Sequence, residues 1–129
     1  MADIIWIDRL MTISIHDDQI AAHGGAYGIL NQAMLESALA RPRNLYVYEE
    51  VDLFQLAAAY AYGLAKNHGF VDGNKRTAFL VTFAFLKVNG WHLYVAEPEV
   101  VLTMQNLAAG VISETELAQW LRSHSQPNS

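Results

Sequence analysis

Apolar residues recur along the chain at the spacing of one helix face, and capping or turn residues divide them into six segments. The segment 53–67 is apolar on nearly all faces and rich in alanine, which is typical of a central, buried helix. Residues 4–7 and 92–95 are short β-like runs and indicate short strands. We therefore expect helices over residues 13–23, 34–40, 53–67, 74–89, 98–109 and 114–124.

Capping signals set several of these helix ends. Two residue pairs match the capping box, namely Asp52 with Gln55 and Ser113 with Glu116. In a capping box, the side chain of each residue accepts a hydrogen bond from the backbone N–H of the other. Gly24 follows the first helix and permits the left-handed conformation that commonly ends one.

The segment between Pro42 and Glu50 departs from the helical pattern. Asn31 is expected to cap the second helix, and Pro42 to end it, because proline has no N–H to donate. Residues 45–48, Leu-Tyr-Val-Tyr, have β propensity but no neighbouring strand in the sequence. We interpret them as a flap, which either adds a strand to an extended segment of a substrate or partner protein or is an ordinary ordered loop.

Length and composition indicate a single domain over residues 1–129, and the predicted helices make it all-α. The chain has 129 residues, of which 53% are hydrophobic and 16% charged, so it can bury one compact core. We expect a helical bundle of about six helices with a few short strands or a flap, and a polar tail, residues 123–129, that frays. Since the chain has no cysteine, disulfides, thiolate nucleophiles and cysteine-ligated zinc are excluded.

Charge and hydropathy narrow the function classes. The N-terminus carries Asp3 where a secretion signal is basic, and the apolar runs are shorter than the roughly 20 residues that cross a bilayer. The net charge is -5, whereas most nucleic-acid-binding proteins have a broad basic surface. We therefore expect a cytoplasmic protein that binds neither membranes nor nucleic acids directly, with any anion site confined to a small region.

Residues 68–77, His-Gly-Phe-Val-Asp-Gly-Asn-Lys-Arg-Thr, place charge where a helix disfavours it. Lys75 and Arg76 fall in the first turn of a helix, where the macrodipole favours anions and each cation costs a few tenths to about 1 kcal/mol. The backbone N–H groups after Gly73, together with both cations, would form a cradle for phosphate. A Walker A loop is excluded, because Gly69 and Gly73 are too close together and a helix precedes them.

Asp72 and His68 add a metal ligand and a base beside this cradle. The Asp72 carboxylate lies one residue before Gly73, where it is well placed to hold a Mg²⁺ ion that bridges phosphate oxygens. Histidine has an unperturbed pKa of about 6.5, which suits a general base that takes the proton of an attacking hydroxyl. The segment has no activated serine or cysteine, so we assign the hydroxyl to the substrate. The alternative is that His68 and Asp72 are helix caps and the cations a solvated surface.

The motif HxFxDGNKR, residues 68–76, resembles the signature of the Fic/Doc superfamily. Its lysine resembles the death-on-curing (Doc) toxin branch, and segments 24–28, 35–42 and 86–90 are also similar to Doc-type chains, so the resemblance covers about residues 10–124. It implies an all-helical Fic fold and a toxin that uses ATP and Mg²⁺ to phosphorylate a hydroxyl of a cellular protein of the translation machinery, elongation factor Tu in the studied case. It also implies an antitoxin protein that inhibits by binding.

The resemblance assigns roles by position. His68 would be the catalytic base and Asp72 the Mg²⁺ ligand, while Phe70 would anchor the loop in the core. The residues that would contact the nucleotide phosphates are Gly73, Asn74, Lys75 and Arg76.

Two positions favour phosphate transfer over transfer of AMP. Fic adenylyltransferases resemble a pattern with glycine at position 75 and a second arginine at position 79, whereas this chain has Lys75 and Phe79. A lysine fills space that glycine leaves open, and the lost arginine removes one contact to phosphate. The remaining alternatives are a catalytically silent binding protein and a ribonuclease toxin, which the net charge of -5 disfavours.

Histidines and aromatic residues outside the motif are given structural roles. His16 and His23 are seven residues apart and would lie on similar sides of a helix, but with no third ligand we favour two surface histidines over a metal site. Five aromatic residues on apolar helices are assigned to the core, namely Tyr60, Tyr62, Phe79, Phe83 and Phe85.

Overall fold

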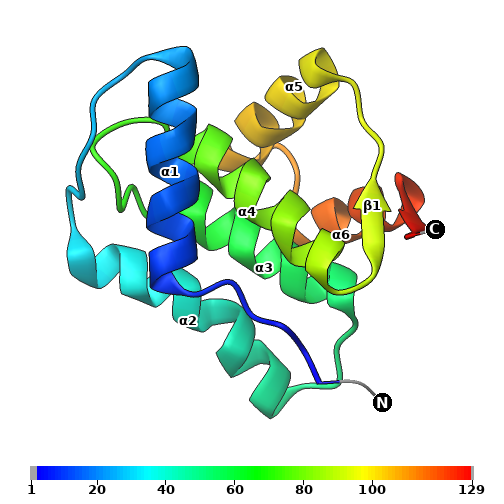
Figure 1. Cartoon of the computed structure of the whole chain (residues 1–129). Coiled ribbons are helices and arrows are strands. Elements are labelled where there is room, and N and C mark those ends of the chain that lie inside the picture. The colour runs from blue at the N-terminus through cyan, green and yellow to red at the C-terminus, as the bar shows by residue number, and fades with distance from the viewer. Residues whose placement is uncertain (1–2, 129) are drawn as a thin grey trace.

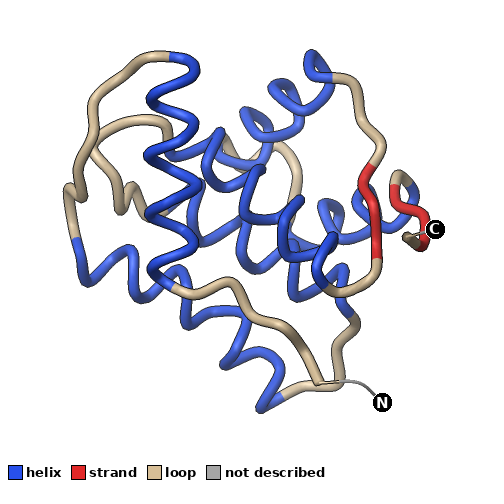
Figure 2. Tube along the Cα trace, in the orientation of Figure 1, coloured by secondary structure: helices blue, strands red, loops and turns tan. Residues whose placement is uncertain are grey.

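The computed structural model describes residues 3–128 and consists mainly of helices, which confirms the predicted all-α bundle (Figures 1 and 2). Met1, Ala2 and Ser129, at the ends of the predicted domain, lie outside the described residues. Within residues 3–128, no helix is long and apolar enough to cross a membrane. The elements in chain order are α1 (Arg9–His23), α2 (Gln32–Tyr48), α3 (Leu53–Lys66), α4 (Asn74–Val88), β1 (Trp91–Leu93), α5 (Glu97–Ala108), α6 (Glu114–Ser123) and β2 (Ser125–Pro127).

α3 is the centre of the bundle, as its apolar sequence predicts. It packs against α2, α4, α5 and α6, and most of its side chains are buried (Figure 1). The predicted capping box of Asp52 and Gln55 is present, with both hydrogen bonds at 2.9 Å. α4 lies along α3 and contributes Val81 and Phe85 to the same core. Because packing fixes both helices, it also fixes the two ends of the loop that joins them.

α2 continues beyond its predicted end, so the prediction of a flap over residues 45–48 is wrong. Asn31 caps the helix as expected, accepting the Met34 N–H at 3.0 Å. Pro42, however, lies inside the helix, which runs on to Tyr48. A proline in a helix costs about 3 kcal/mol, but Pro42 is buried and Leu45 packs against the core, so burial of these turns offsets the lost hydrogen bond.

Residues 4–7 form no strand, contrary to the prediction. The backbone N–H of Ile7 donates to the Tyr60 hydroxyl at 3.0 Å, and that hydroxyl donates to the Ile7 carbonyl at 3.1 Å. A buried side chain therefore takes the place of a neighbouring strand. α1 begins at Arg9, ahead of the predicted position 13, because Asp8 caps it by accepting a first-turn N–H at 2.9 Å.

The C-terminal tail is paired, so the expectation that residues 123–129 fray is wrong for the part that the structure describes. β2 runs antiparallel to β1, with Leu93 opposite Ser125. Beyond β2, the Asn128 N–H donates to the Gly90 carbonyl at 2.9 Å. The pairing uses main-chain groups, which every non-proline residue carries, so the polar side chains of the tail gave no sign of it.

Candidate functional site

The loop between α3 and α4 carries the residues of the predicted site. Two backbone N–H groups just ahead of α2 donate to the Gly69 carbonyl at 2.8 and 3.1 Å, which holds the loop against the start of that helix. A Cβ at position 69 would lie 2.9 Å from the Cβ of Leu35, so only glycine fits without a shift. Phe70 is 2% exposed and anchors the loop in the core, as predicted.

The Asn74 side chain closes the loop. Its amide oxygen accepts the Phe70 N–H at 3.0 Å, and its amide nitrogen donates to the Phe70 carbonyl at 3.0 Å. One amide N–H and the amide oxygen are therefore used within the chain itself. The backbone N–H and the second amide N–H are the donors of Asn74 left for the phosphate contact that the sequence predicts.

α1 supports the other side of the loop. His16 is 1% exposed, its Nε2 donates to the Asp72 carbonyl at 2.7 Å, and its ring stacks on Phe70. Gln19 is also buried, and its Nε2 would lie 2.0 Å from a Cβ at position 73. The prediction that His16 is a surface histidine is wrong. The signal that could have found it is the spacing of His16 and Gln19, which places two polar side chains on one face of α1.

The first turn of α4 presents three unpaired backbone donors. Gly73 is the N-cap, with a left-handed φ of 72°, and no side chain caps the helix. In the described part of the chain, the N–H groups of Asn74, Lys75 and Arg76 have no acceptor. Unpaired N–H groups at a helix N-terminus form a general binding site for anions. Two cations and no acidic residue lie in this turn, so its charge is positive.

Asp72 lies at the edge of this turn with an exposed carboxylate. Its Oδ1 accepts the Gly73 N–H at 2.8 Å, and its Oδ2 accepts the Ala26 N–H at 3.2 Å. Since a carboxylate oxygen has two lone pairs, each oxygen retains one for a further ligand. Residues 3–128 contain no group of three or more acidic, histidine or cysteine side chains that would hold a metal by themselves. The arrangement fits a Mg²⁺ ion held by one carboxylate, phosphate oxygens and water.

His68 lies at the opposite end of the loop, directly after α3. Its φ is 50°, the left-handed region that residues other than glycine seldom adopt. Such backbone conformations cost on the order of 1–3 kcal/mol and are concentrated at functional sites. The side chain is exposed, so a substrate in solution can reach the imidazole.

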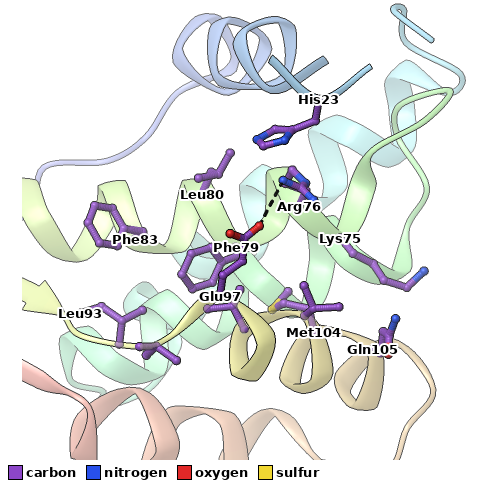
Figure 3. A pocket seen from close by; sticks show the side chains of 13 residues that line it. His23, Lys75, Arg76, Phe79, Leu80, Phe83, Leu93, Glu97, Met104 and Gln105 are labelled. Atoms are coloured by element: carbon purple, nitrogen blue, oxygen red, sulfur yellow. Dashed lines mark ion pairs between the residues drawn. The ribbon is translucent and has the colours of Figure 1, made fainter. Parts of the chain in front are cut away.

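A cavity of about 520 Å³ lies between α4 and α5, beside the charged turn (Figure 3). Its walls are mainly apolar and include Phe79 and Phe83, so these two rings line a cavity where the sequence predicts a filled core. Tyr60 and Phe85 are fully buried, as predicted. His23 lies at the rim of the cavity and not beside His16 at the motif loop.

Lys75 and Arg76 border both the loop and this cavity. Figure 3 shows Lys75 at one end of the cavity and Arg76 facing Glu97, with the two charged groups 3.9 Å apart. Neither His68 nor Asp72 lines the cavity. The structure therefore gathers the predicted site residues along one loop and one helix turn, with the two cations between the loop and the cavity.

Comparisons with known proteins identify the family of the chain. The family model described as the Fic/DOC family matches residues 6–86. The chain is 35% identical over 111 residues to protein kinase doc of Escherichia phage P1, covering 85% of this chain and 87% of that protein. It is 40% identical over 74 residues to toxin Doc of Mycolicibacterium smegmatis, covering 56% of this chain and 57% of that protein. The chain belongs to the Fic/Doc family.

Proposed function

We propose that this protein is a Doc-like toxin that acts as a protein kinase, transferring the γ-phosphate of ATP to a hydroxyl of a cellular protein. The observation that carries the proposal is the first turn of α4, where unpaired N–H groups and two cations occur together without an acidic residue. This arrangement lowers the stability of the unliganded helix, and a bound phosphate offsets that cost. The names of the two relatives, protein kinase doc and toxin Doc, support the same activity.

In this proposal the nucleotide phosphates bind across the first turn of α4. The backbone N–H groups of Asn74, Lys75 and Arg76 donate to phosphate oxygens, the Lys75 ammonium adds a point charge, and the Arg76 guanidinium offers a planar fork. The ion pair of Arg76 with Glu97 is long, at 3.9 Å, and Glu97 is 76% exposed. An exposed pair of this kind contributes little, so phosphate can replace Glu97 as the partner of Arg76.

Asp72 is the residue that would hold Mg²⁺. The N–H groups of Gly73 and Ala26 orient its carboxylate before any ion arrives, which reduces the cost of binding. A bound Mg²⁺ would neutralise charge on the phosphate oxygens during transfer.

His68 is the proposed general base. The proton of the substrate hydroxyl passes to a ring nitrogen of His68 while the hydroxyl oxygen bonds to the γ-phosphorus. The bond from that phosphorus to the β,γ-bridging oxygen breaks, and ADP leaves with the electron pair. The loop supplies no hydroxyl or thiol nucleophile of its own, so the phosphate passes directly to the substrate.

Two protein partners follow from the proposal. The substrate is a protein of the translation machinery, with elongation factor Tu as the first candidate because the motif resembles that of Doc toxins. The second partner is an antitoxin protein that keeps the kinase inactive while bound. Both interactions are placed in the cytoplasm and need neither a membrane nor direct binding of nucleic acid, consistent with a net charge of -5.

The position of the transferred phosphorus tests the proposal. The protein is incubated with Mg²⁺, candidate target proteins and ATP labelled at either the α or the γ phosphorus, with His68→Ala as the matched control. We expect γ label, and no α label, on a target with the unaltered chain, and no label with His68→Ala. Transfer of α label would show AMP transfer and overturn the kinase assignment.

A further inference from the structure

We propose that His16 is a positioning residue of this site, which orients the Asp72–Gly73 peptide and, through it, the Asp72 carboxylate. The effect on Mg²⁺ rests on the function proposed above, whereas the effect on the loop does not. His16 belongs to α1 and is 56 positions from Asp72, outside the motif. It would act through the loop backbone without contacting the substrate.

His16 holds one end of a single peptide unit. Its Nε2 donates to the Asp72 carbonyl at 2.7 Å. Because a trans peptide is planar, the Gly73 N–H of the same unit points in the opposite direction. That N–H donates to Asp72 Oδ1 at 2.8 Å. Imidazole, peptide and carboxylate therefore form one chain of hydrogen bonds, and rotation of the peptide would also move the carboxylate.

Packing holds the His16 ring in place. The ring is 1% exposed and stacks on Phe70 with a centroid distance of 3.9 Å and an angle of 5° between the planes. The backbone of Phe70 is itself fixed by two hydrogen bonds with the Asn74 side chain, one in each direction. His16 thus contacts the loop on both sides of Val71, through the Phe70 ring before it and the Asp72 carbonyl after it.

A histidine at position 16 leaves a buried ring nitrogen without a hydrogen-bond partner, which packing alone does not explain. In the neutral tautomer whose Nε2 donates to a carbonyl, Nδ1 bears a lone pair, and in this structure Nδ1 is buried without a hydrogen-bond partner. The carboxylate of Asp17 is 3.7 Å away, beyond hydrogen-bond distance. Phenylalanine would fill the same space and stack on Phe70 without an unpaired acceptor. What it lacks is the donor for the Asp72 carbonyl, which is the property that the proposed role requires.

The test compares His16→Phe, which keeps the stacking ring, with His16→Gln, which keeps a donor of similar reach. His124→Phe is the matched control, because His124 also bonds a backbone carbonyl, that of Trp120 at 2.8 Å, and its ring packs in a tilted contact on the Trp120 ring, but it is the C-cap residue of α6. The first readout is hydrogen exchange of the Gly73 amide in the nucleotide-free protein. We expect exchange at least about tenfold faster in His16→Phe, near the unaltered rate in His16→Gln, and unchanged in His124→Phe.

The second readout is the Mg²⁺ concentration that gives half-maximal transfer. We expect it to rise about 10- to 100-fold in His16→Phe, as is usual when the group that orients a metal ligand is removed, and to stay unchanged in His124→Phe. Unchanged Gly73 exchange in His16→Phe would overturn the positioning role, whatever happens to activity. Faster exchange together with no phosphate transfer by the unaltered chain would instead leave the positioning role standing and remove the kinase. If His16→Phe does not fold, His16→Met, which also fills the space without a donor, takes its place.

Discussion

Polar groups have different surroundings in the core between α3 and α4 and in the loop that joins these two helices. In the core, the Thr82 hydroxyl donates to the Ala78 carbonyl at 2.7 Å, and the Tyr60 hydroxyl bonds the backbone of Ile7 as both donor and acceptor. In the loop, His68 has a strained backbone. The first turn of α4 holds two cations and no acidic residue, Arg76 pairs only at 3.9 Å with the exposed Glu97, and three N–H groups have no acceptor among residues 3–128. The core satisfies its polar groups internally, whereas the loop leaves them for a ligand.

This difference predicts which variants change stability and which change activity. Removal of a core contact should lower the free energy of unfolding and leave each folded molecule active. Removal of a loop charge should lower activity and leave the free energy of unfolding unchanged or higher, because in the proposed function these charges bind the nucleotide phosphates. Functional sites commonly lower the stability of the folded protein, and in this chain we expect that loss of stability at residues 68–76.

His68→Ala should give the largest effect on activity. A positioned general base contributes about 10²- to 10⁴-fold to rate, so phosphate transfer should fall by that factor while thermal unfolding stays unchanged, since the exposed ring stabilises little. Transfer measured at saturating ATP and unfolding measured by circular dichroism check both parts. A variant that transfers phosphate at the full rate would remove His68 from the mechanism.

Phe85→Ala should give the opposite result in the core. Phe85 is fully buried between Tyr60 and Trp6, and truncation of such a ring costs about 3–5 kcal/mol. Denaturant unfolding measures the loss, and Phe85→Leu serves as a milder variant if the alanine form is too unstable. The rate of transfer per folded molecule should stay the same. A large loss of rate in a fully folded core variant would break the distinction between the two regions.

Tyr60 should give the core a dependence on alkaline pH. Burial raises the pKa of Tyr60 from its ordinary 10.0 to about 12, because the phenolate is disfavoured away from water. Since the folded pKa lies above the unfolded one, this stabilisation is present below pH 10 and is lost as the pH rises toward 12, by on the order of 2–3 kcal/mol. Tyr60→Phe should remove this part of the pH dependence in denaturant unfolding. Equal slopes for the two proteins would contradict it.

Local sequence signals were sufficient for most helix ends and for the motif. The capping boxes at Asp52 and Ser113 occur as predicted, because each depends on residues only three positions apart. The motif was recognisable for the same reason, since its unfavourable charges and its glycine lie within one helix turn. The catalytic and ligand-binding roles of its residues remain predictions.

Contacts between distant segments could not be predicted from one sequence. α2 passes Pro42 because the turns around it are buried by other helices, and the tail is ordered by main-chain pairing with β1. The burial of His16 was missed for the same reason, since its partner Asp72 is 56 positions away, and the spacing of His16 and Gln19 on one face of α1 was the one local signal that pointed to it.

Lys75→Gln tests most directly whether the first turn of α4 is less stable without a ligand because it is built to bind phosphate. The lysine lies where the helix dipole disfavours it, so the variant should unfold in the absence of nucleotide at the same free energy or at one up to about 1 kcal/mol higher. Stabilisation by ATP and Mg²⁺ follows the binding constant, so it should shrink in the same protein.

Lys87→Gln is the matched control, because Lys87 lies in the last turn of the same helix, where a cation is favourable. That variant should lose a little stability and keep the full shift with nucleotide. Thermal unfolding of the three proteins, with and without ATP and Mg²⁺, is the deciding measurement. The account predicts unchanged or raised intrinsic stability and a reduced nucleotide shift for Lys75→Gln alone. Destabilisation of the nucleotide-free Lys75→Gln protein by several kcal/mol, with its nucleotide shift intact, would contradict it.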